Sequence, residues 1–328
     1  MSNYDLSWSD LAFGSKKCLR ELDAIFIAAP REISKKRLTQ LIKEHLPSGN
    51  IIIGCAKELY IDGFNNQPQF KTLQIDSSDK LIDKVNKSAS HNKITVLHYN
   101  QSDFIHIVEK VKFRLVLLVN GSWYNSFHTR PEYYKLVSRN IDFKFISPFV
   151  DENEAKQYAN NFDVKTENTD ELLSETQMMA IANQTASNSF DNAHQTGVAV
   201  GKKIGDKYKL ITTAYNKGVP YPTFAWHFGA LREKHLSSPG DLNYYDTVHA
   251  EVMLIMNAGQ NKINLAGTTL FINLLPCPTC ARMLCESSIS EIVYTLDHSE
   301  GYAVALLEKA NKKVTRLIDV DKMLKNGG

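Results

Sequence analysis

The chain has 328 residues, of which 43% are hydrophobic, and a formal net charge of +2 at pH 7. This size allows two ordinary domains, each with its own apolar core. The sequence has no uninterrupted apolar span of membrane length, and its polar start at residues 1–10 lacks the layout of a signal peptide, so we expect a cytoplasmic protein without a membrane partner. The near-neutral charge also disfavours a nucleic-acid partner, because long-chain binders usually concentrate Lys and Arg.

The first half of the chain alternates short apolar runs with amphipathic, helix-like stretches. The predicted strands are residues 23–29, 50–56, 93–99, 114–120 and 142–149, with a weaker run at 70–75. The predicted helices are residues 34–45, 79–87, 102–111 and 131–139. Nearly unbroken apolar strands separated by such helices are typical of a parallel sheet covered on both faces. We therefore expect residues 1–160 to form a Rossmann-like α/β domain.

In such sheets, ligands bind beyond the carboxyl ends of the strands. The most polar segment at such an end is residues 120–130, which read NGSWYNSFHTR. The segment combines hydrogen-bonding groups, aromatic rings and a guanidinium suited to phosphate or carboxylate, so it is a candidate second site. An equally good interpretation is a loop packed by its own aromatic rings. The sequence contains neither G-x-x-x-x-G-K-[ST] nor G-x-G-x-x-G, which argues against a P-loop or dinucleotide-binding domain.

A polar stretch divides the chain near its middle. Residues 160–175 read NNFDVKTENTDELLSE and contain few large apolar side chains, as is typical of a linker. We expect the two domains to be residues 1–160 and 177–328, joined by residues 161–176. Within the second domain, the predicted strands are residues 196–200, 208–214, 268–275, 291–294 and 313–317.

Two short motifs in the second half carry the candidate chemistry: His249-Ala250-Glu251 and Pro276-Cys277-Pro278-Thr279-Cys280. A neutral imidazole from His249 and thiolates from Cys277 and Cys280 would hold Zn²⁺ and leave the fourth tetrahedral position to water. Zinc lowers the pKa of such a water toward neutrality, and Glu251 would carry the proton to a departing amine. Each motif alone also occurs in redox proteins, in structural zinc sites or by chance. Their order, after a β-type run, predicts a catalytic zinc site.

The spacing within each motif supports this geometry. A predicted helix capped by Thr247 or Asp246 would place His249 and Glu251 in its first turn. A second predicted helix, residues 277–287, carries the two cysteines three positions apart and therefore on one face. The dipole at the start of that helix favours both thiolates.

With these motifs, residues 178–317 resemble the deoxycytidylate deaminase branch of the cytidine deaminase-like superfamily. The carrying segments are residues 197–200 (GVAV), 214–220 (AYNKGVP), 249–251 (HAE) and 276–284 (PCPTCARML). The P-C-P-x-C-A form is more similar to this branch than to the tRNA adenosine deaminases, and so is the long insert before His249, with Trp226, Arg232 and Tyr244-Tyr245. The resemblance implies an α/β/α sandwich that binds zinc and deaminates a cytosine nucleotide, with deoxycytidylate to deoxyuridylate and ammonia as the first candidate reaction.

The resemblance also implies roles for two further positions, and we expect the protein to form a homo-oligomer. Asn216 would bind the sugar, and the backbone of Ala250 would recognise the pyrimidine carbonyl. The resembling proteins usually have Arg or Lys beside a Ser in the stretch that corresponds to residues 187–191, which here reads SNSFD. The sequence therefore leaves a nucleoside, a nucleotide and a modified pyrimidine open as substrates.

Two other functions remain open at this point. The large first domain, which a small-molecule deaminase does not require, is compatible with a deaminase that acts on cytosine or adenine in RNA or single-stranded DNA. A closed zinc site completed by Cys285 or His298 would instead indicate a non-catalytic, nucleotide-sensing module. The other cysteines, Cys18 and Cys55 among them, show no pairing pattern, which fits a reducing compartment.

Overall fold

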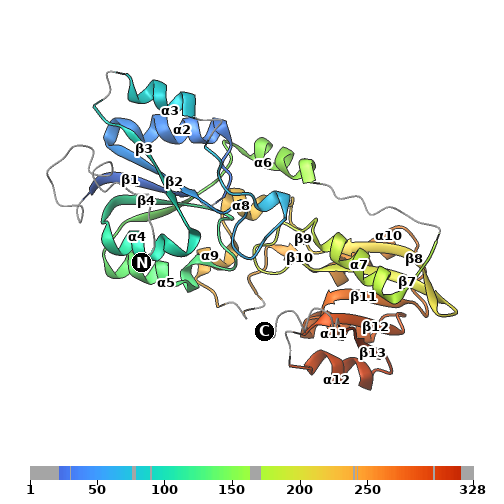
Figure 1. Cartoon of the computed structure of the whole chain (residues 1–328). Helices are drawn as coiled ribbons and strands as arrows, with labels where there is room; N and C mark the ends of the chain where they lie inside the picture. The colour runs from blue at the N-terminus through green and yellow to red at the C-terminus, as the bar shows by residue number, and fades with distance from the viewer. Residues whose placement is uncertain are drawn as a thin grey trace. The chain divides into compact units, whose positions relative to one another are not determined.

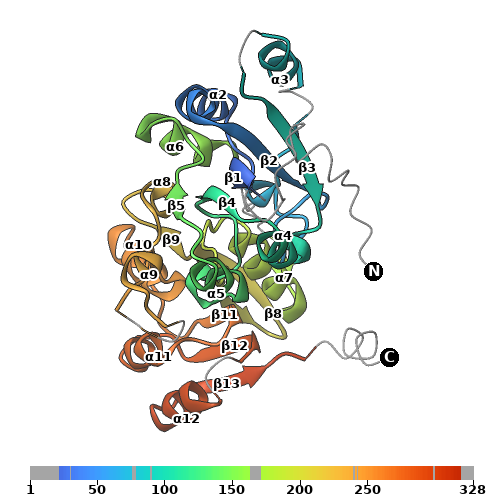
Figure 2. The same cartoon turned by 90° about the vertical axis from the view of Figure 1, so that its left-hand side faces the viewer.

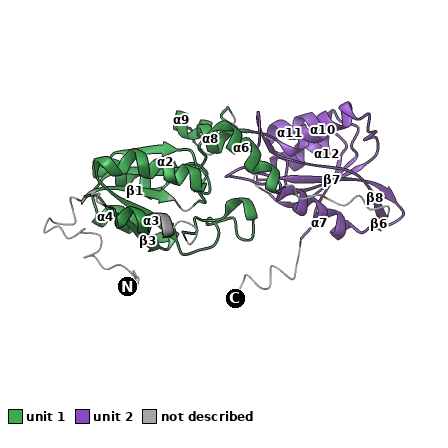
Figure 3. Ribbon diagram, turned by 90° about the horizontal axis from the view of Figure 1, so that it is seen from above, with its two compact units in different colours: residues 1–162, 223–246 green, residues 163–222, 247–328 purple. Residues whose placement is uncertain are grey.

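The computed structural model describes residues 22–29, 31–75, 79–88, 91–162, 171–238, 241, 243–297 and 300–318. The chain forms two compact units (Figures 1 and 3). Unit 1 comprises Met1–Phe162 and Thr223–Asp246, and unit 2 comprises Asp163–Pro222 and Thr247–Gly328. The compact units thus place residues 223–246 with the first part of the chain, whereas the sequence-based boundaries, which stay a prediction, put them in the second domain.

Unit 1 is built on a parallel five-stranded sheet with the order β3-β2-β1-β4-β5 (Figure 2). Its strands are β1 (Leu22–Ala29), β2 (Asn50–Ala56), β3 (Ile94–Tyr99), β4 (Phe113–Val119) and β5 (Phe143–Ile146). Its sequence-adjacent helices are α2 (Lys35–His45), α3 (Asp79–Asn86), α4 (Phe104–Lys110), α5 (Pro131–Ser138) and α6 (Glu152–Ala159). The predicted doubly wound, Rossmann-like sheet is confirmed.

Strand β1 shows why this sheet is covered on both faces. Its side chains alternate, so that Phe26 packs into one core with residues of α4 and α5. Ile25 and Ile27 point the other way, into a core with residues of α2 and α3. A strand buried on both faces needs apolar residues at nearly every position, which is the unbroken pattern seen in the sequence.

Two predicted strands of unit 1 differ from the structure. Residues 70–75 form only single β-bridges at Lys71 and Thr72, and the chain before them turns through a 3₁₀ helix that starts at Pro68. The predicted strand 142–149 ends at Ile146, because Pro148 has no backbone N–H to donate to a ladder. The short 3₁₀ helices of the chain are η2 (Leu46–Ser48), η3 (Pro68–Phe70), η4 (Gln101–Asp103), η5 (Phe127–Thr129) and η6 (Asn160–Phe162).

Unit 2 is a six-stranded mixed sheet with the order β13-β12-β11-β7-β8-β6. Its strands are β6 (Leu172–Leu173), β7 (Gly197–Ile204), β8 (Lys207–Tyr215), β11 (Thr269–Leu274), β12 (Glu291–Leu296) and β13 (Lys313–Arg316). The helices are α7 (Glu175–Ala186), α10 (Ala250–Gln260), α11 (Pro278–Cys285) and α12 (Tyr302–Lys309). A separate ribbon pairs β9 (Lys217–Gly218) with β10 (Thr247–Val248), and the segment between them carries α8 (Phe224–Phe228) and α9 (Leu231–His235).

The helices of unit 2 cover both faces of its sheet, which confirms the predicted α/β/α sandwich. Residues of α10, α11 and α12 share one core with the sheet, and Figure 2 shows α11 and α12 beside β12 and β13. Residues of α7 share the opposite core with Ala199 and Phe271. Helix α7 begins within the predicted linker, where Ser174 and Gln177 form a capping box. Every helix in the described part of the chain is too short or too polar to cross a bilayer.

Gly197 shows how closely α7 packs against β7. A Cβ atom at this position would lie 2.2 Å from the carbonyl oxygen of Ala182 and 2.4 Å from the backbone nitrogen of Ala186. Because neither backbone can move freely, we expect Gly197→Ala to destabilise the protein by about 3 kcal/mol. Gly259→Ala, at an open position of α10, should instead stabilise it by roughly 0.5–1 kcal/mol. Urea unfolding of both variants would measure the change in the free energy of unfolding and check that it has opposite signs.

Candidate metal centre

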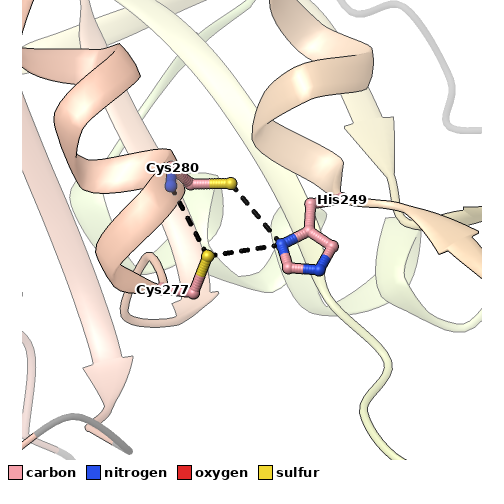
Figure 4. A group of neighbouring side chains, drawn as sticks. All are labelled: His249, Cys277 and Cys280. Atoms are coloured by element: carbon pink, nitrogen blue, oxygen red, sulfur yellow. Dashed lines mark hydrogen bonds between the residues drawn. The ribbon is translucent and has the colours of Figure 1, made fainter. Parts of the chain in front are cut away.

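Three side chains predicted to bind metal lie together in unit 2. The ligand atoms of His249, Cys277 and Cys280 are all within 4.8 Å of one another. Nδ1 of His249 is 3.5 Å from each of the two sulfur atoms, as the dashed lines of Figure 4 mark. The spacing of the two motifs in the sequence is thus matched by convergence in space.

The first residues of two helices bring these groups together. His249 is the N-cap of α10 and has an extended backbone, with φ −63° and ψ 152°. This corrects the predicted cap, because Thr247 lies in β10 and Asp246 precedes it. Cys277, the predicted first residue of the second helix, is the N-cap of α11, which begins one residue later at Pro278. Its sulfur accepts from the backbone N–H of Cys280 at 3.5 Å. That N–H belongs to the first turn of a helix, so it favours a thiolate.

The geometry of the cluster fits a tetrahedral zinc ion. Zinc bonds of about 2.3 Å to sulfur and 2.0–2.1 Å to nitrogen at a tetrahedral angle place the two ligand atoms roughly 3.5 Å apart. Both observed separations between Nδ1 of His249 and the sulfurs have this value. One imidazole and two thiols are also a donor set that zinc accepts at catalytic sites.

The three side chains of the cluster also shift one another's pKa values. The hydrogen bond that Cys280 donates lowers the pKa of the Cys277 thiol, and the same bond raises the pKa of Cys280. The hydrogen bond between His249 and Cys277 raises the pKa of the imidazole. Where the two sulfurs bind as thiolates and His249 as neutral imidazole, a metal ion among them would offset the negative charge.

Glu251 lies beside the cluster in the first turn of α10 and is only 3% exposed. Burial raises the pKa of its carboxyl group to about 7, and a hydrogen bond with Cys280 partly opposes that shift. A carboxyl group with a pKa near neutrality can both accept and release a proton at neutral pH. Its side chain thus has the properties of a general acid and base next to the candidate metal ligands.

A polar network missed by the sequence analysis lies in the same unit. Asp191 accepts hydrogen bonds from Nδ2 of Asn216 (3.2 Å), from Oγ1 of Thr247 (2.9 Å) and from the backbone of Ala193 and His194. The negative charge of Asp191 also contributes to the raised pKa of His249. The stretch 187–191 contains no cation, and the acidic residue at its end is the sequence signal for this network.

The two positions with implied substrate roles are both buried. Asn216 is 4% exposed, its Oδ1 accepts from the N–H of Thr196, and its Nδ2 donates to His194 as well as to Asp191. Ala250 is 0% exposed and is the first residue of α10, so its N–H has no acceptor within the helix. Their roles toward a substrate stay predictions.

The remaining candidate groups lie elsewhere or outside the described residues. The Cys285 thiol donates to the carbonyl of Leu306 (3.8 Å) and is not part of the metal-type cluster found among the described residues. Cys18 and His298 lie outside the described residues. In unit 1, Trp123 and Phe127 of the segment 120–130 are buried, and the centres of their rings lie 4.6 Å apart. This agrees with the interpretation of the segment as a loop packed by its own aromatic rings.

Comparison with known proteins agrees with this site. Residues 173–296 match the family model described as the cytidine and deoxycytidylate deaminase zinc-binding region. This part of the chain, here called the deaminase region, is similar to the zinc-binding region of that family. The predicted resemblance is therefore confirmed, and all three candidate ligands and Glu251 fall within the deaminase region.

Individual relatives of the deaminase region carry corresponding names. A probable deoxycytidylate deaminase of Drosophila melanogaster is 27% identical over 147 residues, which are 44% of this chain and 68% of that protein. The human deoxycytidylate deaminase is 28% identical over 132 residues, which are 39% of this chain and 68% of that protein. A crystal structure of the dCMP deaminase of cyanophage S-TIM5 with dCMP and dUMP is similar at 17% identity and a TM-score of 0.35, over 44% of this chain and 96% of that chain.

Proposed function

We propose that this protein hydrolyses the exocyclic amine of deoxycytidylate to give deoxyuridylate and ammonia. The observation that supports this most directly is the convergence of His249, Cys277 and Cys280 beside the buried carboxyl group of Glu251. The names of the relatives of the deaminase region favour deoxycytidylate over other cytosine compounds. Homo-oligomeric assembly and a cytoplasmic location stay predictions.

The proposed reaction exchanges an amine for water at C4 of the pyrimidine. His249, Cys277 and Cys280 would hold zinc, which supplies Lewis acidity and allows water to react as a nucleophile near neutral pH. Glu251 accepts a proton from the attacking water and delivers a proton to the amine, which leaves as ammonia. The water oxygen becomes the C4 carbonyl, and its two protons end on N3 of the ring and on the departing ammonia. One water is therefore consumed for each ammonia released.

The buried groups around this chemistry could orient the substrate. Ala250 is the first residue of α10, so its N–H has no acceptor within the helix and would donate to the pyrimidine carbonyl. Both Nδ2 hydrogens of Asn216 are used within the protein, and its Oδ1 accepts from Thr196. Oδ1 has a second lone pair, so we propose that Asn216 accepts a hydrogen bond from a sugar hydroxyl.

A substrate panel with ammonia release as readout tests the proposal. The panel contains cytidine, deoxycytidine, their mono- and triphosphates, and a cytosine-containing single strand. We expect deoxycytidylate to have the highest kcat/KM. Turnover of the single strand alone would replace the proposal with a nucleic-acid deaminase, and zinc-loaded protein that releases no ammonia from any compound would refute deamination of cytosine.

A further inference from the structure

Residues 223–246, here called the strap, belong to unit 1 although unit 2 precedes and follows them in the chain. Figure 3 shows the two strap helices, α8 and α9, in the colour of unit 1. The strap begins after Pro222, which follows β9, and ends directly before Thr247, the first residue of β10. Thr247 lies two residues before His249. The chain that leads into the deaminase site is therefore held at one end by the first unit.

The first attachment of the strap is a stack between Arg31 and Trp226. The guanidinium carbon of Arg31 lies 3.4 Å from the centre of the Trp226 ring, and the two side chains are 0% and 1% exposed. The guanidinium donates twice to the carbonyl of Gln69, at 2.9 and 3.0 Å. Within the described residues, no carboxylate forms an ion pair with Arg31, and desolvation lowers its pKa. Tyr158 and Glu32 raise the pKa of Arg31 in the opposite direction, and the face of Trp226 is a further stabiliser of this buried cation.

Trp226 is also fixed by the body of unit 1. Its ring meets Phe70 edge to face at 5.3 Å, and a Cβ atom at Gly121 would lie 3.0 Å from the indole. Two neighbours of Trp226 in the strap form hydrogen bonds as well. The hydroxyl of Thr223 donates to the carbonyl of Ala155, and the ring of His227 is hydrogen-bonded to the hydroxyl of Ser147. Helix α8 is therefore anchored through several independent contacts.

The second attachment is made by His128 of unit 1. Its Nδ1 lies 3.2 Å from a carboxylate oxygen of Glu233 in α9, and its Nε2 lies 2.9 Å from the carbonyl of Ser237. Both side chains of the His128–Glu233 pair are largely buried, with 9% and 13% exposed. Buried, hydrogen-bonded pairs of this kind hold position better than exposed ones.

The last residue of the strap transmits this anchoring toward the site. The carboxylate of Asp246 accepts the backbone N–H of Leu231, the first residue of α9, at 3.2 Å. The next residue, Thr247, donates to Asp191, which also holds the amide of Asn216. The anchored end of the strap is thus joined by a single peptide bond to the network of Thr247, Asp191 and Asn216.

We propose that unit 1 positions the substrate-binding side of the deaminase site through the strap, with Arg31 and His128 as positioning residues. The inference rests on the proposed function for its kinetic readout. Loss of either attachment should leave the zinc ligands and Glu251 unchanged, because their contacts lie within unit 2. It should weaken ground-state binding through Thr247, Asp191 and Asn216, which raises KM more than it lowers kcat.

The test compares Arg31→Met with Arg139→Met. Methionine keeps much of the side-chain volume and removes the charge. Arg139 is a matched control because it also lies in unit 1 and donates to a backbone carbonyl, that of Val108, in a contact that does not involve the strap. We expect Arg31→Met to raise KM for deoxycytidylate by roughly tenfold at nearly constant kcat and zinc content. We expect the KM of Arg139→Met to equal that of the wild type.

Hydrogen exchange gives a readout that does not need turnover. In Arg31→Met, backbone amides of the β9–β10 ribbon, which pairs Thr247 with Gly218, should exchange faster than in the wild type and in Arg139→Met. A purely structural role of Arg31 would lower the thermal midpoint without changing KM or ribbon exchange. Unchanged exchange in the ribbon overturns the inference, even where wild-type turnover supports the proposed function. If the wild type does not turn over deoxycytidylate, hydrogen exchange in the ribbon alone tests whether Arg31 is a positioning residue.

A milder variant keeps the proposal testable where Arg31→Met fails to fold. Glu233→Gln preserves shape and removes the charge opposite His128, so it should shift KM and ribbon exchange in the same direction by a smaller factor. Glu109→Gln is its control, because this exposed carboxylate pairs with Lys135 elsewhere in unit 1. If Glu233→Gln and Glu109→Gln have the same KM and the same amide hydrogen exchange in the ribbon, His128 is not a positioning residue.

Discussion

Glu251→Gln should reduce turnover of deoxycytidylate by on the order of 10²–10⁴-fold while the protein keeps its zinc. Glutamine has almost the same shape as glutamate and can hydrogen-bond at the same place, but it cannot accept and release a proton. Because Glu251 lies beside the cluster and is not one of its three ligands, its replacement leaves the metal-binding atoms in place. The measurement is kcat from ammonia release, together with zinc content per chain.

The control for this variant is its metal content and its unfolding curve. Glu251 is 3% exposed and burial raises its pKa to about 7, so a neutral amide fits the site without a buried charge. We therefore expect the stability of Glu251→Gln at neutral pH to stay within about 1 kcal/mol of the wild type. Near-normal turnover by the zinc-loaded variant would show that another group moves the proton.

The sequence predicted the parts of the fold that local patterns determine. Strand β2 was located at both ends, because its apolar run is bounded by Gly49 and by Lys57. The convergence of Cys277 and Cys280 was predictable because a strand followed by C-x-x-C leads to a helix whose start carries both sulfurs. In these cases the residues that decide the structure lie within a few positions of one another.

The sequence did not predict features that depend on distant partners. Trp226 was read as part of an insert in the deaminase region, whereas its stacking partner Arg31 follows β1 in the first unit. Asp191 belongs to the site only because β7 and β8 bring Thr196 and Asn216 together. Local composition does not encode such contacts, so the membership of residues 223–246 in unit 1 came from the structure alone.

The second large effect concerns the metal ligands themselves. Cys277→Ser and Cys280→Ser should each lower zinc content per chain and abolish measurable deamination, because a hydroxyl is a much poorer zinc ligand than a thiolate. Cys285→Ser is the matched control, since this cysteine lies in the same helix and donates to the carbonyl of Leu306, away from the cluster. Zinc content and ammonia release of Cys285→Ser should match those of the wild type.

Chelation separates loss of the metal from loss of the fold. A ligand that binds only the folded state at about 1,000 times its Kd stabilises that state by roughly 4 kcal/mol, so removal of zinc should lower the unfolding midpoint of the wild type. The same chelator should hardly change the midpoint of Cys277→Ser, which has little zinc to lose. In metal-free protein, hydrogen bonds among His249, Cys277 and Cys280 would still hold the cluster together. Added zinc should therefore restore activity to the chelated wild type and not to the serine variants, and recovery by Cys277→Ser would argue that its sulfur is not a ligand.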